Sequence, residues 1–107
     1  MKKITEDYIS FFNSRNLDKT MEMFHEDAIL IDPTNVYEGT NEIEKEVKRI
    51  FHSCTNLSFS AKNIFYDGAT SISVIEFSLL LDSTSLRGVD IIQWDGGKIL
   101  KLTAYVN

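Results

Sequence analysis

The sequence predicts an α+β fold in a single domain spanning residues 1–107. The length is typical of one domain with one core, and no Gly-, Pro- or Ser-rich linker divides the chain. The apolar spacing is helical in the first half, apart from one short strand. It then changes to β-rich runs separated by turn residues over residues 57–106. Helices kept apart from a mostly antiparallel sheet characterise the α+β class.

Helical spacing predicts the first helix over residues 5–14, with Thr5 as a possible N-cap, and the second over residues 17–25. A strand follows at residues 28–32, and residues 34–39 are predicted as a turn. A third helix begins at Thr40, again a possible cap, and ends near Ser53. Its residues Ile43, Val47, Ile50 and Phe51 share one apolar face.

Four β-rich runs follow, at residues 57–66, 71–81, 86–94 and 98–106, with turn sequences such as DG, DSTS and DGG between them. Runs of this kind predict successive antiparallel hairpins. The strand over residues 86–94 is unusual because Asp90 lies in its middle. Alternation places Asp90, Ile92 and Trp94 on one face and Arg87, Val89 and Ile91 on the other.

Composition excludes several function classes. The formal net charge is −5 and the basic residues are scattered, which argues against a nucleic-acid partner. The sequence has no apolar run long enough to span a bilayer and no signal-peptide core, so we expect no membrane partner and a cytoplasmic location. Cys54 is the only cysteine, and His25 and His52 match no metal motif, so we predict neither a metal site nor a cofactor.

Three side chains are candidates for chemistry. Asp32 ends a strand before Pro33, a place where aspartate often only forms a turn, but where a carboxylate can also point into a pocket as a base. Asp90 must either pair with a cation or keep a proton, because an isolated buried charge is costly; it can also be a satisfied edge or interface residue. Tyr8 lies on the apolar side of the first helix, where tyrosine is usually part of the core.

The runs YISFFNSRNLD from Tyr8, MFHEDAILIDP from Met23 and GVDIIQWDGGKI from Gly88 resemble the SnoaL-like and ketosteroid-isomerase-like branch of the NTF2-like superfamily. The resemblance covers essentially the whole chain. It implies a cone-like, strongly curved sheet wrapped around the third helix, a hydrophobic pocket between sheet and helices, and a homodimer formed through the outer sheet face.

The resemblance also implies roles for the three candidates, in an enzyme type that is itself a known example of carboxyl tuning. Asp32 matches the general base, Tyr8 the oxyanion donor and Asp90 the protonated acid beside it. The implied reaction is cofactor-free proton transfer next to a carbonyl on a small hydrophobic substrate. Val47 stands where those enzymes carry a supporting tyrosine, so the hydrogen-bond network is thinner here.

Two other functions stay open. The chain can be a noncatalytic module that binds a hydrophobic ligand or forms a dimer, or a dehydratase or hydrolase that uses His25 or His52. Val47, Phe51 and Trp94 are predicted to form the apolar pocket wall. Glu76 lies within a strand on the same parity as Val74 and Leu80, and the sequence leaves three places open for it: the pocket rim, an interface, or the pocket itself as another carboxylate.

Overall fold

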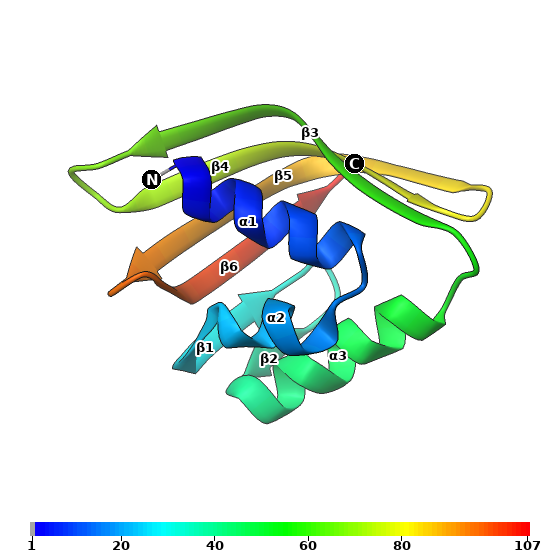
Figure 1. Cartoon of the computed structure of the whole chain (residues 1–107), viewed down its shortest axis with the longest axis horizontal. Coiled ribbons are helices and arrows are strands. Elements are labelled where there is room, and N and C mark those ends of the chain that lie inside the picture. The colour runs from blue at the N-terminus through cyan, green and yellow to red at the C-terminus, as the bar shows by residue number, and fades with distance from the viewer. Residues whose placement is uncertain (1) are drawn as a thin grey trace.

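The protein, described by a computed structural model over residues 2–107, has the predicted α+β architecture. The helices are α1 (Lys2–Asn13), α2 (Leu17–Glu22) and α3 (Thr40–His52). The strands are β1 (Phe24–Ile31), β2 (Val36–Glu38), β3 (Leu57–Asp67), β4 (Ile72–Leu81), β5 (Thr84–Asp95) and β6 (Lys98–Val106). Figure 1 shows this order, with α1 along the sheet and α2 and α3 beside β1 and β2.

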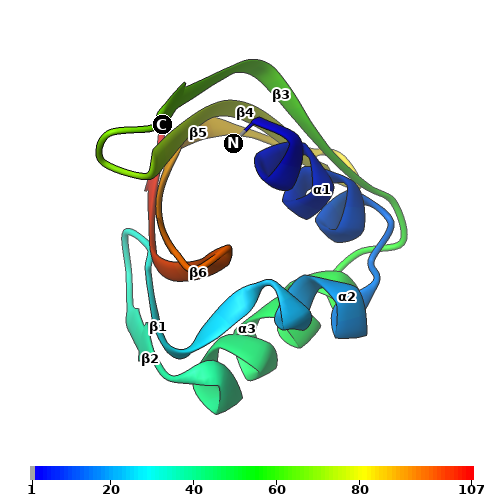
Figure 2. The ribbon, with the colours of Figure 1, turned by 60° about the vertical axis from the view of Figure 1, so that its left-hand side comes forward.

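All strands belong to one sheet with the order β2-β1-β6-β5-β4-β3. The last four strands form the predicted antiparallel meander, and only the pair of β1 and β6 is parallel. Figure 2 shows that the sheet is strongly curved and unclosed, with all three helices on its concave side. The curved, mostly antiparallel sheet is therefore confirmed, although α1 as well as α3 lies within the curve, where α1 packs on β3 and α3 on β1 and β2.

The segment predicted as a turn over residues 34–39 contains the short strand β2. Its three residues pair with β1 in antiparallel register, from Ile31 opposite Val36 to Ile29 opposite Glu38. Three residues are too few to show a period, so the turn-forming neighbours dominated the prediction. Gly39, with a φ of 87°, occupies the N-cap position before α3. Thr40 is therefore the first helical residue and not the cap.

The N-cap prediction for Thr5 is also wrong, because α1 begins at Lys2 and Thr5 lies inside it. Thr5 is fully buried, and its hydroxyl is 2.7 Å from the Ser73 hydroxyl on β4. The Trp94 indole donates to the same Ser73 oxygen at 2.8 Å. This buried chain of polar groups ties α1 to β4 and β5, and so fixes the helix that carries Tyr8.

Two further boundaries differ from the prediction. The second helix ends at Glu22, and β1 begins at Phe24, where the chain pairs with Ile99 of β6. The predicted turn over residues 82–85 is shorter, since β5 already starts at Thr84 and Asp82 takes a φ of 55°. Sheet pairing decides both boundaries: Phe24 pairs with the distant Ile99, and Thr84 pairs with Leu81 across the hairpin.

The predicted phase of β5 is confirmed. Asp90, Ile92 and Trp94 are buried against the concave side, while Ile91 is 36% exposed on the convex face. Among the described residues, no helix is long and apolar enough to cross a membrane.

Candidate functional site

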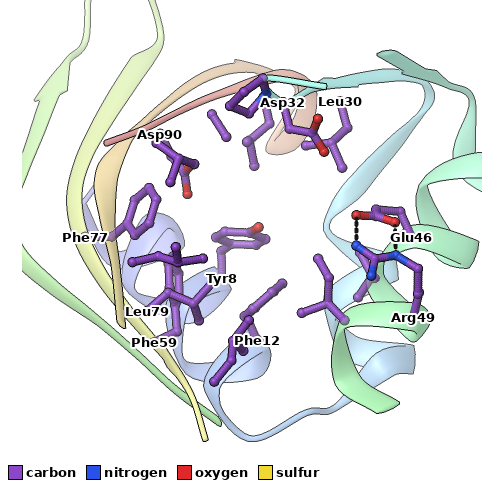
Figure 3. Close-up of a pocket in the computed structure, with 18 of the residues that line it drawn as sticks. Tyr8, Phe12, Leu30, Asp32, Glu46, Arg49, Phe59, Phe77, Leu79 and Asp90 are labelled. Carbon is purple, nitrogen blue, oxygen red and sulfur yellow. Dashed lines mark hydrogen bonds and ion pairs between the residues drawn. The ribbon is translucent and has the colours of Figure 1, made fainter. Parts of the chain in front are cut away.

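A cavity of about 360 Å³ opens between the concave face of the sheet and helices α1 and α3. Its lining is mostly apolar and comes from α1, α3 and strands β1, β3, β4, β5 and β6. Figure 3 shows the labelled lining residues, with the Tyr8 hydroxyl and the Asp90 carboxyl pointing into the cavity. The lining comprises Tyr8, Phe12, Phe24, Leu30, Asp32, Pro33, Thr34, Glu46, Val47, Arg49, Ile50, Phe59, Phe77, Leu79, Leu81, Leu86, Asp90, Leu102, Ala104 and Val106.

We call the innermost part of this cavity, formed by Tyr8, Phe59, Phe77 and Asp90, its deep end. Each of these four residues is 5% exposed. Neither the Tyr8 hydroxyl nor the Asp90 carboxyl has a hydrogen-bond partner within residues 2–107. The sheet itself brings Asp90 here, because β4 and β6 place the apolar residues Ile75 and Ala104 beside it.

Burial sets the protonation of both groups. Loss of solvent raises the pKa of Asp90 from 3.8 to about 7, because the charged carboxylate is poorly solvated there. Burial, with a smaller contribution from Asp90, raises the pKa of Tyr8 well above 10. At neutral pH, Tyr8 is therefore a hydrogen-bond donor, and Asp90 is divided between a neutral donor and a charged acceptor.

We call the outer end of the cavity, formed by Asp32, Thr34, Glu46 and Arg49, its mouth. Asp32 follows β1 directly, and its Oδ1 atom accepts three hydrogen bonds, from the Thr34 amide at 2.9 Å, the Thr34 hydroxyl at 2.9 Å and the Asn35 amide at 2.8 Å. Partial burial alone would raise the pKa of Asp32, but these hydrogen bonds and the Arg49 charge lower it below 3.8. Asp32 is thus both the turn former and a pocket carboxylate, and it is ionised.

The second carboxylate at the mouth was missed in the sequence. Glu46 is only 7% exposed, and Arg49 holds it with two hydrogen bonds of 2.7 Å, from Nε to Oε1 and from Nη2 to Oε2. The signal was present, because Glu46 lies three residues after Ile43 and beside Val47, on the apolar face of α3. The mouth therefore carries two carboxylates and one guanidinium.

The structure places Val47 in the cavity lining but not the other two predicted wall residues. The Phe51 ring packs edge-on against Phe12 at 5.0 Å, outside the lining. The Trp94 ring lies in the core, where its indole nitrogen is bonded to Ser73. Helix α1, which the sequence did not position, contacts Phe51 through Phe12 and is linked to Trp94 through Thr5 and Ser73.

The predicted wall also lacked four phenylalanines that line the cavity, namely Phe12, Phe24, Phe59 and Phe77. All four are buried core residues, but the spacing in the sequence did not assign them to the wall. It could not separate the core from the cavity wall, because that distinction depends on which elements face each other.

The histidines lie away from the cavity. His25 accepts a hydrogen bond from the Asp27 amide at 3.0 Å, and His52 is exposed at the end of α3. Glu76 lies on the convex face, where it accepts a hydrogen bond from Asn63 at 2.8 Å. A histidine-based dehydratase or hydrolase site is therefore not formed by this cavity. Within residues 2–107, no three His, Cys, Asp or Glu side chains are grouped to hold a metal ion.

The family follows from a comparison with known protein families. Residues 5–102 match the model of the SnoaL-like domain, which is most of the chain. The chain belongs to the SnoaL-like family. No curated protein matches it in sequence.

Solved structures share this fold at low sequence identity. An NTF2-like protein of unknown function from Cytophaga hutchinsonii has a TM-score of 0.86 at 12% identity, over 99% of this chain and 88% of that one. A candidate ketosteroid isomerase from Kribbella flavida has a TM-score of 0.86 at 15% identity, over 98% and 76%. A candidate SnoaL-like polyketide cyclase from Shewanella putrefaciens has a TM-score of 0.83 at 12% identity, over 98% and 88%. The SnoaL-like chain thus has the NTF2-like fold.

Proposed function

We propose that this protein is a cofactor-free enzyme that transfers a proton next to a carbonyl group on a small hydrophobic substrate. One observation carries the proposal. The Tyr8 hydroxyl and the Asp90 carboxyl point into one apolar cavity, and neither has a hydrogen-bond partner within residues 2–107. Two donors in a dry pocket stabilise the oxygen of an enolate far more than water does.

The roles follow from protonation. Tyr8 and neutral Asp90 donate hydrogen bonds to the carbonyl oxygen, and these bonds strengthen as negative charge develops on it. Asp32 at the mouth accepts the proton from the carbon beside the carbonyl and returns it to the same or a conjugated carbon. The proton count is unchanged at the end, which makes the reaction an isomerisation or an enolate-based cyclisation.

The hydrogen bonds and the lowered pKa of Asp32 limit the class of substrate that it can deprotonate. Its Oδ1 atom is already occupied by three hydrogen bonds, so Oδ2 is the atom available as base. A carboxylate whose pKa is lowered is a weak base. The substrate carbon must therefore be acidic before it binds, as in a conjugated enone or a carbon between two carbonyl groups.

The test is proton exchange at carbon. Cyclic enones and 1,3-diketones are incubated with the protein in D₂O, and deuterium uptake is followed by ¹H NMR. Asp32→Asn should lower the rate by about 10²–10⁴-fold, which is the range for a general base. Glu26→Gln, which removes an exposed carboxylate of β1, is the matched control and should leave the rate unchanged. Full activity in Asp32→Asn would disprove the role of Asp32.

The pH profile tests Asp90 separately. The oxyanion donors are complete only while Asp90 keeps its proton, so the exchange rate should fall as pH rises through about 7. The Asp90→Asn variant, which keeps a donor at every pH, should lose this fall. An unchanged profile in the variant would remove Asp90 from the mechanism.

One observation favours a second function. The three hydrogen bonds to Asp32 Oδ1 are those of a turn-forming aspartate, which needs no catalytic role. If the protein only binds a hydrophobic ligand, the ligand is recovered without product, and its affinity is the same in wild type and Asp32→Asn.

We also propose that the protein forms a homodimer through the convex face of the sheet. Strand register aligns a mostly apolar row across all six strands there: Phe65, Val74, Ile91, Thr103, Ile31 and Val36. Phe65 and Val36 are 59% and 61% exposed, and all helices lie on the opposite face. Sedimentation should give a dimer, and Ile91→Lys should give a monomer. A wild-type monomer at high concentration would contradict the pairing.

A further inference from the structure

The deep end of the cavity holds chemistry that proton transfer does not use. Asp90 shares the cavity lining with aromatic rings, which form one connected cluster around Tyr8. The Tyr8 ring lies 6.1 Å from Phe12, 6.1 Å from Phe24 and 6.4 Å from Phe59, and Phe59 lies 5.6 Å from Phe77. All five rings belong to the cavity lining. Ring faces carry partial negative charge and attract cations, most strongly where water is excluded.

No cation is paired with Asp90 in the part of the chain that the structure describes. Of these described residues, Arg49 is the one basic side chain in the lining, and it is bound to Glu46 at the mouth. Arg87 on β5 lies on the opposite face of the sheet by strand alternation. When Asp90 loses its proton, its charge is therefore buried without compensation, a state that a cationic ligand would stabilise.

The rest of the cavity also favours a cation over an anion. Around Asp90, the titratable groups that face the cavity are Tyr8 from α1, Asp32 after β1, and Glu46 and Arg49 from α3. The neighbouring strands β4 and β6 contribute apolar residues at this level. Asp32, Glu46 and Arg49 sum to one negative charge at the mouth, and the whole chain carries −5. This negative charge repels anions and attracts cations.

We propose that this cavity also binds a small tertiary or quaternary alkylammonium ion. Its charge lies against the Asp90 carboxylate, and its N-alkyl groups contact the aromatic rings. This binding needs Asp90 ionised, whereas the proposed proton transfer needs Asp90 neutral. The two functions therefore respond to pH in opposite directions and can be tested independently.

The test compares choline with 3,3-dimethyl-1-butanol, which has the same shape but a carbon in place of the charged nitrogen. Affinities are measured by titration calorimetry at pH 5.5 and pH 8.5. Choline should bind at least tenfold more tightly at pH 8.5, because Asp90 titrates near 7. The neutral analogue should bind equally at both values.

Two variants locate the binding. Asp90→Asn keeps the shape of the side chain. It should abolish the tenfold pH effect and reduce the preference for choline over its analogue to the part that the aromatic rings supply. Glu26→Gln, which removes one exposed negative charge elsewhere, should bind choline as the wild type does. Phe59→Leu should lower the affinity for choline several-fold more than the affinity for the neutral analogue, because it removes one aromatic ring from the cluster.

Three results would overturn the proposal. The first is no measurable choline binding at pH 8.5. The second is a neutral analogue that binds as tightly as choline at that pH. The third is choline binding that survives unchanged in Asp90→Asn, which would place the cation outside the deep end.

Discussion

The polar groups at the mouth of the cavity have hydrogen-bond partners, whereas those at its deep end have none among the described residues. At the mouth, Asp32 accepts three hydrogen bonds, and Glu46 is held at both oxygens by Arg49. At the deep end, Tyr8 and Asp90 have no hydrogen-bond partner within residues 2–107 and share the cavity lining with aromatic rings.

This difference indicates at which end of the cavity a bound ligand can stabilise the folded protein. A polar group that is buried without a partner costs free energy, and a ligand that supplies the partner recovers it. The mouth has little to gain in this way, because its charged groups are already paired. The deep end is thus the place where a polar ligand gains most from binding.

The largest expected effect concerns the charge at the deep end. The folded protein keeps a proton on Asp90 up to about pH 7, whereas a free aspartate loses it near 3.8. Between these values the folded state binds more protons than the unfolded state, so the free energy of unfolding falls as pH rises. The contribution is fully present below about 3.8 and is lost once pH exceeds about 7. At 1.36 kcal/mol per pKa unit, it is about 4 kcal/mol.

Asp90→Asn removes this titration. From pH 4 to pH 8, the free energy of unfolding of the variant should rise by about 4 kcal/mol relative to that of wild type. Urea denaturation at several pH values measures this difference, and other titrating groups cancel because both proteins share them. Parallel stability curves for the two proteins would show that Asp90 is not the buried titrating group.

The next effect concerns packing at the deep end. Gly88 lies two residues before Asp90 on the same face of β5, and Phe77 packs over it. A Cβ atom at this position would lie 2.0 Å from the Tyr105 carbonyl oxygen and 2.9 Å from the Phe77 ring. Gly88→Ala should therefore destabilise the protein by about 1–3 kcal/mol, as other overpacked cores do.

The matched control is Gly68→Ala, where the nearest atom to the new Cβ is 3.8 Å away. This change should be close to neutral in a thermal or urea denaturation. If both alanine variants lose equal stability, the contacts of a Cβ atom at position 88 with Tyr105 and Phe77 are not the cause of the loss.

Sequence periodicity predicted most of the fold because each long element has a clear apolar repeat. The meander, helix α3 and the buried phase of β5 follow from it. It missed β2, whose three residues carry no period. It also misplaced the caps of α1 and α3. Thr5 is a buried residue inside α1 that contacts Ser73 of the sheet, and Gly39 takes the N-cap position before Thr40.

The candidate site was less predictable than the fold. Tyr8, Asp32 and Asp90 were singled out because polar groups in apolar runs need an explanation, and all three line the cavity. The Glu46–Arg49 pair was missed because charged residues three apart on a helix usually lie on the surface. Phe51 and Trp94 were assigned to the pocket wall, but apolar spacing alone marks burial and not the side of the core that borders a cavity.

A smaller effect tests the mouth. Arg49→Gln leaves the Glu46 carboxylate, only 7% exposed, without its cation. We expect a loss of about 1–2 kcal/mol at neutral pH, at the low end for an unpaired buried charge because the Arg49 side chain is itself 66% exposed. Lys45→Gln is a matched control, since Lys45 pairs with Glu42 at the same spacing on α3 but on the surface. It should cost less than about 0.5 kcal/mol. Equal losses would mean that Glu46 does not depend on Arg49.

The smallest effect on stability is expected at Tyr8. Tyr8→Phe removes a hydroxyl that has no hydrogen-bond partner within residues 2–107, so the free energy of unfolding should change by less than about 1 kcal/mol. Deuterium exchange into an enone should nevertheless fall about 10²–10³-fold, the range for one oxyanion donor. Ser73→Ala reverses this pattern. It removes a buried hydroxyl bonded to Thr5 and Trp94, and should cost about 1–3 kcal/mol.

Together, the two variants separate a hydroxyl that supports the fold from one that is available to a ligand. A large loss of stability in Tyr8→Phe would show that the hydroxyl supports the fold. The deep end would then hold one free polar group, Asp90. A single carboxyl can still face a cation, but the two-donor site for a carbonyl oxygen would no longer exist.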